Sequence, residues 1–118
     1  MSTVVVSTIA PSGGTLTVTS NVNATNFNTT SDQSLKTEIA TIEDAANKVS
    51  QLRGVNFKYI ESGQYTMGVI AQETQAVIPE VVGELPDGKL TVNYQAMVGV
   101  LIEAIKDLQA RVDELENQ

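Results

Sequence analysis

The chain has 118 residues, of which 42% are hydrophobic and 4% aromatic, and it carries a net charge of −7. Its acidic balance, without any basic cluster, argues against a nucleic acid or an anionic membrane as a partner. Cysteine and histidine are both absent, so disulfides, thiolate catalysis, the usual zinc sites and a histidine-based triad are excluded. A core of small aliphatic side chains in so short a chain is expected to be marginal in one copy, which favours self-association.

The chain changes character at Ser31, because no charged side chain precedes Asp32 and all charged residues follow from there. The N-terminal segment has no basic region or long apolar run, so we expect neither a signal peptide nor a membrane span. Residues 15–19 alternate polar and apolar side chains at the strand period. Residues 1–30 are therefore predicted to be the β-structured end of a longer fibre stem, with a disordered polar leader as the alternative.

Helical spacing begins after this boundary, where apolar residues recur at intervals of four and three positions. These residues are Leu35, Ile39, Ile42, Ala46 and Val49. Thr41 and Asp44 resemble a capping box. We therefore expect a firm helix from about Ile42 to about Leu52, with Gly54 as its C-terminal stop.

The middle of the chain is predicted to be a small α+β module. We expect, in order, a strand at residues 55–59, a turn at 62–63, a buried strand at 67–71, a short helix at 72–78 stopped by Pro79, and a hairpin that pairs residues 81–82 with 89–94. The turn of that hairpin would contain the Pro86-Asp87-Gly88 sequence.

The tail is predicted to be a long helix that carries about three heptad repeats. Its a positions are Val98, Ile105 and Val112, and its d positions are Leu101, Leu108 and Leu115. β-Branched residues at a with leucine at d favour a parallel dimer. The alternative is one amphipathic helix packed on its own domain. The spacing also predicts surface ion pairs from Glu103 to Lys106 and from Asp107 to Arg111.

Several short motifs follow one another along residues 27–118. They are Ser31-Asp32-x-x-Leu35-Lys36, Leu52-x-x-Val55-x-Phe57-x-Tyr59, Gly68-Val69-Ile70-Ala71-Gln72-Glu73, Pro79-Glu80, Val92-x-Tyr94 and the Leu-Ile-Glu-Ala-Ile-Lys segment of the tail helix. In this order they resemble the intramolecular chaperone auto-processing domain at the C-terminus of phage endosialidases, tailspikes and tail fibres. The Ser-Asp-x-x-Leu-Lys hexamer alone is weakly specific, whereas the whole series is strongly so.

The resemblance implies an α+β fold whose long C-terminal helix forms a homotrimeric bundle or coiled coil. It implies that the domain guides folding of the upstream fibre and then cuts itself off between Thr30 and Ser31. Ser31 would be the nucleophile and Lys36 the general base. On this interpretation residues 1–30 are the passenger end, residues 31–93 the chaperone module and residues 94–118 the oligomerisation helix.

The resemblance also implies where the protein works and with what. Its partners would be two further copies of itself and the upstream fibre segment, with no cofactor, metal, nucleic acid or membrane. It would fold in the host cytoplasm as part of a phage structural protein and be released after cleavage. The trimer that the family implies differs from the dimer that the heptad rule favours.

A serine–lysine pair needs a neutral lysine to accept the hydroxyl proton. An ordinary lysine has a pKa of about 10.4, and burial in apolar surroundings lowers it. Cleavage would therefore wait until assembly packs surface over Lys36. The Ser31 hydroxyl would attack the Thr30 carbonyl to give an ester that water opens, within one chain or between chains.

Each of these residues also has an ordinary structural interpretation. Ser31 could be a turn or cap serine and Lys36 a solvated lysine, while Gln72 and Glu73 either line the site or begin a helix. For the whole chain, the alternatives are a trimeric fibre tip that assembles without cutting and a coiled-coil adaptor.

Overall fold

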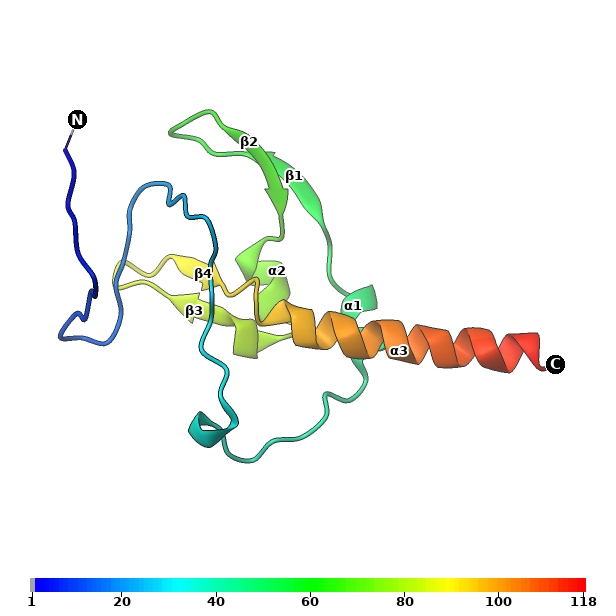
Figure 1. Cartoon of the computed structure of the whole chain (residues 1–118). Coiled ribbons are helices and arrows are strands. Elements are labelled where there is room, and N and C mark those ends of the chain that lie inside the picture. Colours follow the sequence, from blue (N-terminus) through cyan, green and yellow to red (C-terminus); the bar gives the residue numbers. More distant parts are fainter. Residues whose placement is uncertain (1) are drawn as a thin grey trace. The chain divides into compact units, whose positions relative to one another are not determined.

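A computed structural model describes residues 2–118 (Figure 1). The chain divides into two compact units, Met1–Glu38 and Ile39–Gln118. The elements in chain order are η1 (Gln33–Leu35), α1 (Ala45–Ser50), β1 (Val55–Lys58), β2 (Tyr65–Gly68), α2 (Ala71–Gln75), η2 (Pro79–Val81), β3 (Val82–Glu84), β4 (Leu90–Val92) and α3 (Met97–Glu116). The second unit thus has the predicted α+β architecture, with two small sheets and a long C-terminal helix.

The first unit contains one short 3-10 turn, η1, and otherwise irregular backbone. No strand is formed at residues 15–19 in the single chain, and the β-structured stem expected for residues 1–30 stays a prediction. A strand needs a neighbour to satisfy its backbone N–H and C=O groups, and no described segment of this unit supplies one. Every described residue of the unit is exposed to solvent.

Helix α1 is shorter than predicted because Asp44 adopts a left-handed backbone conformation, with φ at 58°. The helix begins at Ala45 and its Asp44 side chain makes no cap, so the predicted capping box is wrong. The N–H of Ala46 is instead satisfied by Asp107 of α3, whose Oδ2 accepts a hydrogen bond at 3.2 Å. Gln51 is the C-cap, so the helix ends before Gly54, which was wrongly predicted as the stop.

The second antiparallel hairpin lies where the sequence predicted it, and the first contains the predicted strand near residues 55–59 and the predicted turn at residues 62–63. Strand β1 pairs with β2, with Phe57 opposite Thr66, and β3 pairs with β4, with Val82 opposite Val92. Their turns contain Gly63 and Gly88, whose φ angles of 70° and 90° lie in the left-handed region that glycine tolerates best.

The apolar run at residues 67–71 is not one buried strand. Strand β2 ends at Gly68, the Met67 side chain is 74% exposed, and α2 already begins at Ala71. Pro79 does not simply stop that helix, since it occupies the first turn of η2, where its missing N–H costs no hydrogen bond. These predictions were wrong because the run is divided between a hairpin end and a helix start.

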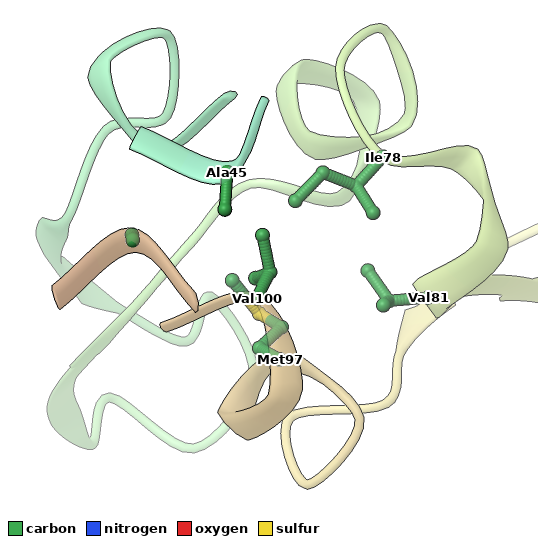
Figure 2. Packing of buried hydrophobic residues seen from close by; sticks show 6 residues of the cluster. Ala45, Ile78, Val81, Met97 and Val100 are labelled. Atoms are coloured by element: carbon green, nitrogen blue, oxygen red, sulfur yellow. The ribbon is translucent and has the colours of Figure 1, made fainter. Parts of the chain in front are cut away.

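Six hydrophobic side chains are buried among the described residues and form the core. They are Ala45, Ile78, Val81, Met97, Val100 and Ala104. Figure 2 shows Ala45 of α1 opposite Val100 of α3, with Ile78 and Val81 beside them. Full burial of a valine, isoleucine or methionine side chain contributes about 1.5–3 kcal/mol, so this is a small core for 118 residues.

Helix α3 has one face on this core and extends beyond it (Figure 1). The buried positions Met97, Val100 and Ala104 recur at intervals of three and four residues, as on one helical face. The turn that leads into the helix is capped by Asn93, whose Oδ1 accepts a hydrogen bond from Ala96 N–H at 3.1 Å. The predicted ion pair of Glu103 with Lys106 is confirmed at 3.3 Å. No Asp107–Arg111 pair forms among residues 2–118, so that prediction was wrong.

Tyr94 fastens the first hairpin to the segment before α3. Its hydroxyl accepts a hydrogen bond from Val69 N–H at 3.1 Å. The same hydroxyl fills the space where a side chain of residue 68 would begin, so only glycine fits there.

Gly68→Ala is expected to destabilise the protein by about 1–3 kcal/mol, because the new Cβ would overlap the Tyr94 hydroxyl. The cost should shrink in a Tyr94→Phe background, which lacks the overlapping oxygen. Urea denaturation of the single and double variants measures this coupling. Gly54→Ala is the matched control, since no atom lies within 4 Å of its added Cβ. Equal costs in both backgrounds would show that the contact is not the cause.

Candidate functional site

Ser31 and Lys36 are brought together by the structure. The Nζ of Lys36 donates a hydrogen bond to the Oγ of Ser31. Both residues lie in the first unit and are exposed. The sequence predicted this pair, and the two side chains are in direct contact although they lie five positions apart in the chain.

The turn η1 creates this proximity. Leu35 N–H donates to the carbonyl oxygen of Asp32 at 3.1 Å, and Lys36 N–H donates to that of Gln33 at 3.0 Å. Asp32 is the N-cap, and its carboxylate accepts hydrogen bonds from the N–H of Ser34, at 3.1 Å, and from its hydroxyl. The backbone therefore folds back between the serine and the lysine.

The hydrogen bonds from Ser34 hold the pKa of the Asp32 carboxyl below its usual range, the hydroxyl contributing most and the backbone N–H next. Hydrogen bonds to the charged form of a carboxyl favour that form. Asp32 is therefore an ionised acceptor at neutral pH. The spacing of the hexamer did not reveal this role, although an aspartate before a turn is a common N-cap signal.

The peptide bond between Thr30 and Ser31 lies in irregular, exposed chain outside η1. A serine hydroxyl can reach the carbonyl carbon of the preceding residue, because the ring that closes has only five members. Ser31 is thus chemically able to attack that bond, and Lys36 is placed to take or return a proton at its oxygen.

Gln72 and Glu73 lie on α2 in the second unit, so their place at the cleavage site stays a prediction. Gln72 lines an open groove of about 490 Å³ together with aromatic residues of the first hairpin, among them Phe57 and Tyr59. Glu73 forms a two-pronged ion pair with Arg53, at 3.1 Å and 2.7 Å. Arg53 was missed by the sequence analysis, because nothing local links residues twenty positions apart.

The heptad residues of α3 all remain outside the core. The exposed fractions of Val98, Leu101, Ile105, Leu108, Val112 and Leu115 lie between 43% and 68%. The helix does pack on its own unit, as the alternative interpretation held, but it does so through a different face. An apolar stripe of about three heptads is therefore left in water.

Among residues 2–118, no group of three or more aspartate, glutamate, histidine or cysteine residues could hold a metal ion. No helix in that range is both long and apolar enough to cross a membrane.

Residues 31–83 match the family model described as chaperone of endosialidase, and the match begins at Ser31. These residues are therefore similar to that family. The chain is also similar to the long tail fibre protein Gp37 of Enterobacteria phage K3, at 43% identity over 107 residues and 83% of this chain. The protein of the same name from Enterobacteria phage T2 gives the same identity and coverage. That of Escherichia phage AR1 is 32% identical over 65% of the chain.

The chain spans only 8–9% of the length of these relatives. Family and relatives together support a role in the assembly of a phage tail fibre. Both the endosialidase chaperone family and the tail fibres were expected from the motifs around Ser31 and Gly68, and this resemblance is confirmed.

The ion pair of Arg53 with Glu73 predicts a dependence of stability on pH. The hydrogen bonds from Arg53 hold the pKa of Glu73 below its usual range. The stability that this ion pair contributes is therefore fully present above the pKa of about 4.3 that Glu73 has in the unfolded chain. It is lost as the pH falls through the lower pKa of Glu73 in the folded protein. Urea denaturation should show Glu73→Gln less stable than wild type at pH 7, with the difference vanishing in strong acid. Glu61→Gln is the control, and a difference that persists in acid would contradict the prediction.

Proposed function

We propose that this chain is an intramolecular chaperone of a phage tail fibre that assembles as a trimer and then cuts its own Thr30–Ser31 bond. The observation that carries the cleavage is the hydrogen bond from Lys36 Nζ to Ser31 Oγ, at the first residue of the family match. The self-association is supported by the exposed heptad stripe of α3. The domain would fold in the host cytoplasm with its partners, the other copies and the upstream fibre.

The proposed reaction uses the two side chains in turn. Lys36, as the neutral amine, takes the hydroxyl proton while Ser31 Oγ bonds to the Thr30 carbonyl carbon. The C–N bond then breaks, and the ammonium of Lys36 returns the proton to the α-amine of Ser31. Water hydrolyses the resulting ester, which leaves a carboxylate on Thr30 and restores the Ser31 hydroxyl. The protein is thus its own substrate and turns over once.

Exposure gives a reason for delay before cleavage. In the single chain Lys36 is exposed to water, whereas the proposed step needs a neutral lysine amine. Surface packed over the lysine in the assembled protein would favour the neutral amine. We therefore expect cleavage to follow assembly.

A second candidate function is a trimeric fibre tip that assembles without cutting. It is favoured by the relatives, which are long tail fibre proteins. In this second candidate the chaperone role and the association through the α3 stripe are unchanged. Ser31 and Lys36 then serve only to form the turn.

Intact mass after denaturation separates the two candidates. We expect wild type to yield residues 31–118, an 88-residue fragment, while Ser31→Ala and Lys36→Ala stay uncut. Ser20→Ala and Lys58→Ala are matched controls that should cut like wild type. A wild-type chain that remains whole in a confirmed trimer would remove the enzyme and leave the structural tip.

The oligomeric role of α3 has its own test. Leu108→Asp places a charge in the heptad stripe and should weaken self-association more than tenfold, because a buried leucine contributes about 2 kcal/mol or more and an unpaired buried charge is costly. Sedimentation equilibrium on the uncleavable Ser31→Ala chain measures the stoichiometry. Ala110→Asp, exposed and outside the stripe, is the control. If both variants associate equally, the stripe is not the interface. A dimeric stoichiometry would contradict the proposed trimer.

A further inference from the structure

We propose that Asp32 is a positioning residue for the Ser31–Lys36 pair and that it acts by capping the turn between them. The inference rests on the proposed cleavage, because it assigns a role within that same site. Asp32 follows the nucleophile directly, yet the recorded bonds of its carboxylate go to Ser34. Its influence on the pair therefore passes through the backbone.

Asp32 supplies two of the acceptors that define η1. Its Oδ2 accepts from both the N–H and the hydroxyl of Ser34, and its carbonyl oxygen accepts from Leu35 N–H. The position of Lys36 is then fixed by its own N–H, which donates to Gln33 at 3.0 Å. Without these bonds the lysine has no defined place relative to the serine.

Packing does not hold this turn, because η1 contains no buried residue. A 3-10 turn of three residues is weak by itself and depends on its local hydrogen bonds. If the turn opened to extended chain, positions 31 and 36 would separate by up to about 17 Å. The fraction of molecules with the pair in contact is thus set by the cap, and that fraction limits the cleavage rate.

The charge of Asp32 offers a rival explanation, in which the carboxylate acts directly on the lysine ammonium. That interaction would stabilise the charged lysine and so oppose its use as a base. The recorded partner of Lys36 Nζ is instead the Ser31 hydroxyl. The cap explanation predicts that the acceptor oxygen matters and the charge does not.

The test compares Asp32→Asn with Asp32→Ala in the assembled protein, with cleavage followed over time by intact mass. Asparagine is an equally good cap residue, so Asp32→Asn should cut within about threefold of wild type, and Asp32→Ala about fivefold to tenfold more slowly. Asp87→Ala is the matched control. Asp87 Oδ1 accepts from Lys89 N–H at 3.0 Å, with the same two-residue spacing, in the hairpin of β3 and β4. It should cut at the wild-type rate.

Each outcome bears on one of the two proposals. If Asp32→Asn is as slow as Asp32→Ala, or more than about threefold faster than wild type, the charge acts rather than the cap and the inference is overturned. If wild type does not cut at all, the proposed cleavage fails. The nuclear Overhauser effect between the Ser31 and Lys36 side chains then decides the positioning role: it should persist in Asp32→Asn and weaken in Asp32→Ala, and its survival in both would refute the inference.

Discussion

Helix α3 has two apolar faces, and the single chain can cover only one of them. The face that contains Met97, Val100 and Ala104 shares one core with residues of α1 and η2, and Val82 of β3 and Val92 of β4 pack against that core. The heptad face, from Val98 to Leu115, stays in water. Because the core contains so few buried side chains, the heptad face is a reserve of exposed apolar area that could stabilise the fold. Assembly would thus complete a core that one copy leaves unfinished.

The first unit contributes no core of its own, because none of its described residues is buried. Its 3-10 turn, η1, is held by local hydrogen bonds and brings Ser31 to Lys36. The chemical pair is therefore a local structure, whereas the stable part of the protein depends on distant contacts. This separation is compatible with the proposed cleavage after assembly, since the pair can be present in every chain and assembly could still change its surroundings.

The elements that could be predicted from the sequence are those whose causes are local. The heptad spacing of α3, the glycines of both hairpin turns and the Ser31–Lys36 spacing are each contained in a few neighbouring residues. The start of α1 could not be found in this way, because Asp44 takes a left-handed conformation and the cap comes from another helix. The Arg53–Glu73 pair and the fit of Tyr94 against Gly68 likewise join positions whose separation follows only from the fold. Strands in the first unit were predicted from alternation alone, which says which face is apolar but not whether a partner exists.

The hydrogen bond from Ala46 to Asp107 has a consequence for the order of folding during synthesis. It joins residues 61 positions apart, and it satisfies an N–H at the start of a helix of only six residues. So short a helix has little stability by itself. Helix α1 therefore cannot be secured until the ribosome has added Asp107, long after Ser31 and Lys36 have left it. Contacts of such long range also slow folding. The nascent chain thus carries Ser31 and Lys36 well before it has the scaffold that follows them, and the second unit can close only after Asp107 has left the ribosome.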